Sequence, residues 1–276
     1  MFSCFVCCCC CRRFFVFCLF VFLLGMDKVI ARPYKRPNAL CRLICFPWAG
    51  GNCSFFIRWC EAFSSIIEVS VIRLAGRECR DKEPFPEDMA EVVNEITSAL
   101  LKDLQEKPFA LFGHSFGSFV SYALAVHLKE KHGLEPVHMF FSGAYGLHSE
   151  YFHLMAKLPE IEDSRLLEHI HTLGGTPPEF LQNEQITTHL LRVLKEDQKV
   201  LVTYPWHDVR KKYFSCDLTC FNGSDEKNHG SEAWLAITSG DTSIYSLPGN
   251  HFYLMEPSNE TFLIKYITKC IENCDI

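Results

Sequence analysis

The sequence predicts an α/β fold in which a mostly parallel central sheet carries an inserted helical cap. Apolar segments of strand length alternate with amphipathic segments of helix length on both sides of residues 146–205, and within that stretch the alternation stops. The chain has 276 residues, 48% of them hydrophobic, and shows no internal repeat or Pro/Gly/Ser-rich linker. We therefore expect one domain over residues 26–276, with the cap at about 146–205.

The first half of the chain contains the strands that begin this sheet. Residues 40–47 and 68–74 are apolar runs that predict buried strands. Residues 86–104 place apolar side chains at helical spacing, with acidic residues in the first turn, which predicts an amphipathic crossover helix. A third apolar run at 108–112 precedes a helical segment, and residues 138–142 predict a further strand. This order is typical of a parallel α/β sheet.

The predicted cap contains two amphipathic helical segments, residues 164–173 and 183–200, around a Gly-Gly-Thr-Pro-Pro run. Such an insertion commonly covers an apolar binding site. The cap also contains four histidines that have no further metal-ligating residues at a suitable spacing. We expect them at the surface or in satisfied hydrogen bonds: His148, His153, His169 and His171. Beyond the cap, strands are expected at 217–221 and 243–247, and a closing helix at 262–270.

Residues 113–117, Gly-His-Ser-Phe-Gly, lie between the 108–112 strand and the helix that follows it. Strand, tight turn and helix are the context of a G-x-S-x-G nucleophile elbow, whose serine here is Ser115. The two glycines lack Cβ atoms, so strand and helix can approach closely while Ser115 takes a strained conformation. This turn would expose the Ser115 Oγ and aim the Phe116 N–H at a developing oxyanion.

A second oxyanion donor is expected from the glycine-rich loop that follows the 40–47 strand. The loop contains Trp48 and Ala49 followed by two glycines and an asparagine. A loop in this position, upstream of the nucleophile, supplies the second N–H in α/β hydrolases. The donor would be the amide of Trp48 or Ala49. The alternative is that the glycine pair only makes a turn.

A base and an acid are expected after the cap. His251 follows the last predicted strand, and the order Ser…Asp/Glu…His is that of the α/β-hydrolase fold, which we therefore predict. A structural role for His251 is the alternative. The acid would follow the 217–221 strand, where Asp225 and Glu226 are adjacent and point in different directions. Asp241, in a polar turn before the final strand, is a weaker third choice.

Residues 1–25 form an apolar, cysteine-rich leader that we predict to lie outside the fold. Its apolar run at 14–24 is short for a membrane span but within the length of a signal-peptide core, and no good cleavage site follows. The competing explanation is a true start at Met26. Of three N-x-S/T sequons, those at Asn52 and Asn222 fall in predicted active-site loops, where a glycan would block chemistry. We therefore expect a cytosolic protein, located in the cytoplasm and not in a membrane.

The composition argues against nucleic-acid binding and against a bound metal. The formal net charge of −6 gives no basic surface for nucleic acid. The cysteines beyond the leader are scattered, several in apolar runs, as expected of small buried side chains in a reducing compartment. Cys41/Cys45 and Cys270/Cys274 lack the paired C-x-x-C units of a zinc site. We therefore expect no bound metal.

Five motifs together resemble the type II thioesterase family. They are Phe-Pro-Trp-Ala-Gly-Gly at 46–51, Gly-Arg-Glu-x-Arg at 76–80, Gly-His-Ser-Phe-Gly at 113–117, Gly-Gly-Thr-Pro at 174–177 and Pro-Gly-Asn-His-Phe at 248–252. The resemblance extends from about residue 40 to the C-terminus. It implies hydrolysis of the thioester that links a fatty acyl chain to acyl carrier protein. It also implies docking on fatty acid synthase in the cytosol, and no metal or organic cofactor.

Two departures from the family pattern matter. The family has Gly-x-x-Asp at the acid, whereas this chain has Gly-Ser-Asp-Glu at 223–226. Either Glu226 takes the role or the loop shifts by one and Asp225 serves. The family's Pro-Gly-Arg-Glu begins here with Ala75, a change expected to be tolerated. Two other interpretations stay open: an esterase, lipase or acyltransferase that uses the same residues, and a non-catalytic acyl-binding homologue.

Overall fold

A seven-stranded sheet forms the centre of the molecule. The computed structural model describes residues 28–147, 149, 152, 157, 160–176, 181–206, 211–226 and 230–274. The predicted leader, His148 and His153 lie outside the described residues. The spatial order of the strands is β1-β3-β2-β4-β5-β6-β7. β1 pairs antiparallel with β3, and the other neighbouring strands run parallel.

The strands and helices confirm the predicted alternation, with ends that differ by a few residues. The strands are β1 (Ile30–Ala31), β2 (Cys41–Phe46), β3 (Ile67–Ile72), β4 (Phe109–His114), β5 (His138–Ser142), β6 (Asp217–Gly223) and β7 (Thr242–Leu247). The helices are α2 (Ser54–Ala62), α3 (Met89–Glu106), α4 (Phe116–His132), α6 (Asp163–Leu173), α8 (Glu184–Val202), α9 (Glu232–Leu235) and α10 (Pro257–Asn273). Short 3₁₀ helices span Glu78–Arg80 and Tyr253–Met255. The sequence had not predicted β1 or α2.

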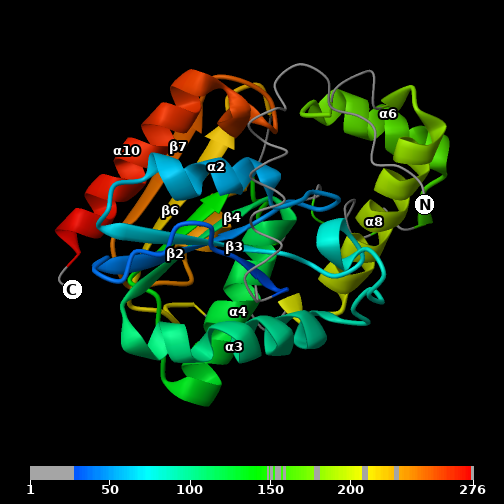
Figure 1. The fold of residues 1–276 in the computed structure, drawn as a ribbon. Helices are drawn as coiled ribbons and strands as arrows, with labels where there is room; N and C mark the ends of the chain where they lie inside the picture. The colour runs from blue at the N-terminus through cyan, green and yellow to red at the C-terminus, as the bar shows by residue number, and fades with distance from the viewer. Residues whose placement is uncertain are drawn as a thin grey trace.

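Helices cover both faces of the sheet. Figure 1 shows α3 and α4 on one side, and α2 and α10 on the other. Two buried hydrophobic clusters follow this division, one containing side chains of α3 and α4, the other side chains of α2 and α10. Successive residues of β2 alternate between them: Leu43 and Cys45 pack with α2 and α10, whereas Ile44 and Phe46 pack with α3 and α4. Both faces are buried, which explains why the strands have continuous apolar sequences.

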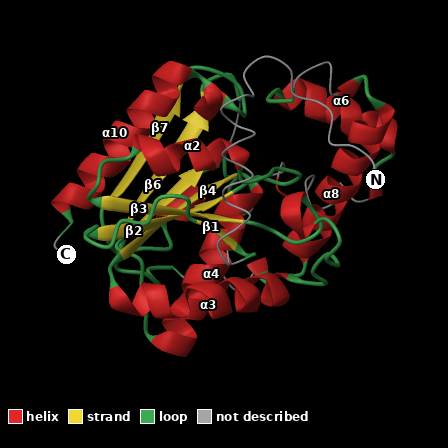
Figure 2. Cartoon of the chain, in the orientation of Figure 1, coloured by secondary structure: helices red, strands yellow, loops and turns green. Residues whose placement is uncertain are grey.

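The helices α6 and α8 lie in the stretch predicted as a cap, apart from the two helical layers (Figure 2). They share a small hydrophobic cluster of their own, formed by Leu166, Ile170, Leu191 and Leu194. The C-terminal end of α8 joins the main core through Val200 and Leu201. α8 therefore connects the cap to the body of the domain.

Most of the free cysteines, and the asparagines of two of the three N-x-S/T sequons, are buried. The nine described cysteines beyond the leader are all free thiols, and Cys41, Cys45 and Cys220 are among those fully buried. Burial raises the pKa of the Cys41 thiol to about 12. The sequon side chains Asn222 and Asn259 are 7% and 4% exposed and are hydrogen-bonded inside the fold. Within the described part of the chain, no helix has the length and apolarity needed to cross a bilayer.

A buried histidine in β5 predicts how stability depends on pH. His138 is 4% exposed, stacks on Phe140 and shares a 2.9 Å hydrogen bond with Thr219 Oγ1. Burial lowers its pKa from 6.5 to about 3. The unfolded chain therefore binds the proton first, and the stability from a neutral His138 is present above pH 6.5 and is lost as the pH falls toward 3.

We expect His138→Gln to reduce the loss of folding stability between pH 7 and pH 5. The wild-type residue contributes about 2 kcal/mol of that loss, because its folded-state pKa lies well below 5. Urea unfolding at the two pH values measures the difference. His132→Gln, at the exposed end of α4, is the matched control and should keep the wild-type pH dependence. Equal losses in wild type and His138→Gln would contradict the assignment.

Candidate active site

Ser115 occupies a strained turn between β4 and α4. Its backbone has φ 52° and ψ −119°, and its N–H donates to the Ser142 carbonyl at 2.7 Å. A Cβ on Gly113 would lie 2.3 Å from the Gly117 carbonyl oxygen, and one on Gly117 would lie 2.2 Å from the carbonyl oxygen of Phe46. Both glycines are thus required by close backbone packing, as the sequence predicted. Phe116 is the first residue of α4, where a backbone N–H has no partner within the helix.

His251 is held by a carboxylate in the loop after β6. Its Nδ1 lies 3.0 Å from the Glu226 Oε1, and the side chains are 3% and 12% exposed. Tyr145 donates its hydroxyl to the same oxygen at 2.5 Å, and its ring stacks on the His251 ring at 5.9 Å. Asp225 is exposed, and its carboxylate instead accepts from its neighbour Ser224. The structure therefore brings Glu226, and not Asp225, to the histidine.

The alternative acid Asp241 lies elsewhere. It is exposed in the turn before β7, where its backbone N–H donates to Asp217. Two other residues at the site were not expected from the sequence. Tyr145 follows β5 in a stretch without periodicity. Gly143 has φ 57°, and a Cβ there would lie 3.1 Å from the His251 ring. No local sequence pattern marks either residue, because each acts through contacts with His251 or Glu226, which are distant in the sequence.

The glycine-rich loop after β2 is fastened to the cap by an ion pair. Arg77 and Asp197 are 4% and 3% exposed and form a bidentate pair, with nitrogen–oxygen distances of 2.7 and 2.5 Å. Asp197 also accepts from the Gly50 N–H at 2.8 Å. The Gly-Arg-Glu motif thus acts on the loop that contains Trp48 and Ala49. Glu78 contributes a second tie, accepting from the Cys53 N–H at 3.2 Å.

One cavity contains both the elbow serine and the histidine. It encloses about 60 Å³ and lies between the sheet domain and the cap. Ser115, His251, Trp48 and Ala49 line it from the sheet domain. The cap contributes apolar side chains and three polar residues: Ile170, Leu173, Leu190, Leu194, His169, Thr176 and Gln198. An apolar chamber with few polar groups suits a lipid-like ligand.

Two further histidines lie near His251. His114 is fully buried behind it, with ring centroids 5.0 Å apart, and its Nδ1 bonds to the Ser142 Oγ at 2.8 Å. Burial, and secondly the charge of His251, hold the pKa of His114 well below its usual 6.5. His169 comes from α6, and burial also lowers its pKa. His169, expected at the surface or in satisfied hydrogen bonds, is half-buried and lines the cavity.

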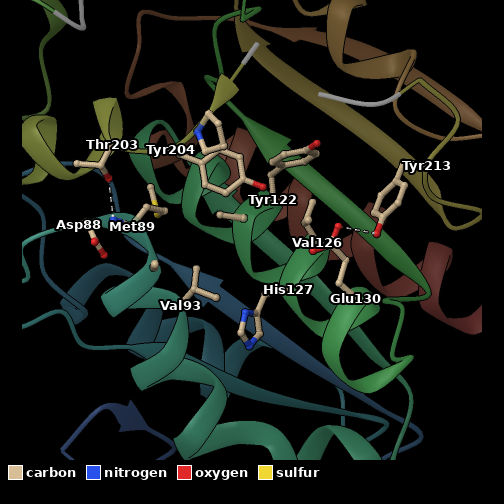
Figure 3. A pocket seen from close by; sticks show the side chains of 13 residues that line it. Asp88, Met89, Val93, Tyr122, Val126, His127, Glu130, Thr203, Tyr204 and Tyr213 are labelled. Atoms are coloured by element: carbon tan, nitrogen blue, oxygen red, sulfur yellow. Dashed lines mark hydrogen bonds between the residues drawn. The ribbon is translucent and has the colours of Figure 1, made fainter. Parts of the chain in front are cut away.

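A larger hollow lies away from this chemistry. It encloses about 510 Å³ between α3, α4 and the segment that follows α8 (Figure 3). Figure 3 shows Tyr122, Tyr204 and Tyr213 around it, with Asp88 and Glu130 at its sides. Neither Ser115 nor His251 lines this hollow. The smaller cavity is therefore the candidate active site.

The arrangement has the components of nucleophilic catalysis. A serine on a strained strand–helix turn and a histidine paired with a carboxylate face one chamber, and backbone amides are available at α4 and the β2 loop. Among the described residues, no group of three His, Cys, Asp or Glu side chains could hold a metal ion. Sheet order, elbow and late histidine define the class as the α/β-hydrolase fold.

Comparison with known proteins identifies the family within this class. The thioesterase domain family matches residues 41–271, so the chain belongs to the thioesterase family. It is 96% identical over 251 residues to the S-acyl fatty acid synthase thioesterase, medium chain, of Anas platyrhynchos, covering 91% of this chain and 100% of that protein. The protein of the same name from Homo sapiens is 39% identical, with 87% of this chain and 90% of that one covered.

Solved structures of thioesterases superpose on this chain. Human thioesterase 2 superposes with a TM-score of 0.66 and 34% identity, covering 86% of this chain and 99% of that chain. RedJ, a thioesterase of the prodiginine pathway in Streptomyces coelicolor, gives a TM-score of 0.75 and 28% identity, covering 90% and 96%. The predicted fold and thioesterase resemblance are therefore confirmed.

Glu226→Gln is expected to lower kcat for thioester hydrolysis on the order of 10⁴-fold, because a neutral amide cannot stabilise the His251 imidazolium and disfavours the required tautomer. Asp225→Asn is the matched control and should stay near wild type, since that carboxylate is exposed and accepts from Ser224, whereas His251 pairs with Glu226. Steady-state kinetics on one thioester measures both. The opposite ranking of the two variants would refute the assignment.

Replacing the residues of the Arg77–Asp197 pair should affect folding stability and catalytic activity differently. Asp197→Leu leaves a buried guanidinium unpaired and should lower the free energy of unfolding by about 3–5 kcal/mol. The double variant Arg77→Met/Asp197→Leu should recover most of that stability, because an apolar pair of similar volume replaces the ion pair. Its activity should stay reduced, since the Gly50 N–H has lost its acceptor. Full recovery of kcat in the double variant would show that the loop containing Trp48 and Ala49, the proposed oxyanion loop, does not need this anchor.

Proposed function

We propose that this chain hydrolyses fatty acyl thioesters carried by acyl carrier protein and so terminates chain growth on fatty acid synthase. One observation carries the proposal: Ser115 and His251, which is paired with Glu226, face a single, mostly apolar cavity beneath the cap. The medium-chain fatty acid synthase thioesterases among its relatives support the same reaction. Acyl carrier protein is the partner that supplies such a substrate.

The reaction proceeds in two halves. Ser115 Oγ attacks the thioester carbonyl carbon while His251 takes its proton, and Glu226 stabilises the resulting imidazolium. The oxyanion accepts from the amides of Phe116 and of Trp48 or Ala49, each worth about 3 kcal/mol. The thiolate leaves and takes the proton from His251 as the free thiol, and the acyl group stays on Ser115 as an ester. Water, deprotonated by His251, then releases the fatty acid and restores the serine.

The cavity must enlarge to admit an acyl chain. Its volume of about 60 Å³ is far less than a medium-length chain occupies. α8 is fixed to the sheet domain by the Arg77–Asp197 pair and by Val200 and Leu201 in the main core. α6 packs with α8 in the small cap cluster. We therefore expect α6, rather than α8, to move when the chamber opens, and we expect the extent of this movement to limit chain length.

Burial supports a location in the cytosol. Glycosylation of Asn222 or Asn259 would require pulling a buried, hydrogen-bonded amide out of the fold. The free thiols of the described cysteines suit a reducing compartment. Fatty acid synthase and its carrier domain are the partners expected there.

Thiol release from decanoyl and palmitoyl thioesters of CoA and acyl carrier protein tests the proposal. The full chain, and a chain that starts at Met26, should both turn these substrates over, and Ser115→Ala should abolish release in each. Ser118→Ala, in the next turn of the same helix, is a fold control whose hydroxyl bonds to the Gly113 carbonyl and not to substrate.

Two outcomes would overturn the proposal. Faster turnover of the matching oxygen esters would favour a carboxylic esterase. Absence of turnover on every thioester, with Ser115 unreactive toward a phosphonate probe, would favour an acyl-binding protein without catalysis.

A further inference from the structure

One buried polar side chain in the catalytic cavity has no part in the reaction described above. Gln198 lies in α8, is 1% exposed and lines the cavity that contains Ser115 and His251. Leu190 and Leu194 precede it at four-residue intervals, so the three side chains share one face of the helix. Its Oε1 has no hydrogen-bond partner among the described residues.

An amide oxygen in this state costs folding free energy. Buried polar atoms are normally hydrogen-bonded, and an unpaired one has lost its water without compensation. Asp197, the preceding residue, has its carboxylate fully engaged by Arg77 and Gly50, so the Gln198 amide is not part of that network. An apolar residue at 198 would continue the leucine face and remove the cost. No described residue supplies a donor to this oxygen, and a ligand bound in the cavity that Gln198 lines is placed to supply one.

The reacting groups of the substrate cannot supply that donor. A saturated acyl chain has no N–H or O–H group, and the thioester oxygen is itself an acceptor. Every acyl carrier thioester does have a donor near the reacting carbon: the amide N–H of the pantetheine arm, two carbons from the sulfur. A donor at that distance enters the site together with the thioester.

We propose that Gln198 is a specificity-determining residue that accepts a hydrogen bond from this first amide N–H of the pantetheine arm. The inference rests on the proposed thioesterase function and assigns the feature of the substrate that the cap recognises. Because α8 is fixed to the oxyanion loop through Asp197 and Gly50, the acceptor stays at a constant position relative to the reacting carbonyl. Gln198 thereby favours carrier-type thioesters over simple alkyl thioesters.

Two substrates that differ in one group test the proposal. The first is decanoyl-N-acetylcysteamine, and the second is its isostere in which CH₂ replaces the N–H. Wild type should hydrolyse the amide substrate with a kcat/KM about tenfold higher, the effect of one hydrogen bond. Gln198→Met keeps the length of the side chain without an amide and should bring the ratio close to one. Gln185→Met, exposed near the start of the same helix, is the control and should keep the wild-type ratio.

Stability measurements separate binding from a structural role. Because Oε1 has no partner among the described residues, the melting temperature of Gln198→Met should equal or exceed that of wild type. A lower melting temperature, with equal losses on both substrates, would show that Gln198 only supports the fold. An unchanged substrate ratio in Gln198→Met would also overturn the proposal.

A third substrate tests the alternative that the donor to Gln198 lies on the acyl chain. 3-Hydroxydecanoyl thioester presents a hydroxyl on the other side of the carbonyl. If Gln198→Met loses activity selectively on this substrate and keeps the N–H preference, the amide assignment is wrong. Failure of wild type on all thioesters would instead contradict the proposed function, so the two failures are distinguishable.

Discussion

The left-handed backbone of Ser115 is the constraint on which the rest of the site depends. A non-glycine residue in such a conformation costs on the order of 1–3 kcal/mol and persists only where its surroundings fix it. Here α4 approaches β4 so closely that no side chain fits at Gly113, and the end of β2 so closely that none fits at Gly117. The Ser115 N–H is in turn held by the carbonyl of Ser142, at the end of β5. The sheet and the first turn of α4 thus determine where the nucleophile lies.

A second constraint joins the oxyanion loop to the cap. A buried ion pair adds little net stability, because desolvation offsets much of the attraction, but it fixes position well. The Arg77–Asp197 pair fixes α8 and, through the Gly50 N–H, the loop that contains Trp48 and Ala49. The wall of the cavity and the loop proposed to supply the second oxyanion donor therefore share one anchor. This explains why the Gly-Arg-Glu motif, remote from the nucleophile in sequence, belongs to the site.

The sequence predicted the parts of the structure that local patterns specify. Strand β5 has the predicted limits, and the elbow follows from its glycines. Helix α2 was missed, because its aromatic residues begin directly after the glycine-rich loop and were not separated from it. The choice between Asp225 and Glu226 could not be made, since the turn is fixed by a tertiary bond from the Asp225 N–H to the Gly249 carbonyl. That bond directs Glu226, and not its neighbour, toward His251.

The polar residues of the cap were beyond prediction for a related reason. His169 and Gln198 have the polarity of surface positions, and only the folded cap turns both toward the cavity. Their supports differ: His169 belongs to α6, which packs in the small cap cluster, whereas Gln198 belongs to α8, which is anchored to the oxyanion loop. A group that moves with α6 cannot keep a constant distance from the carbonyl while the chamber enlarges. Discrimination close to the thioester therefore falls to α8, and accommodation of the acyl chain falls to α6.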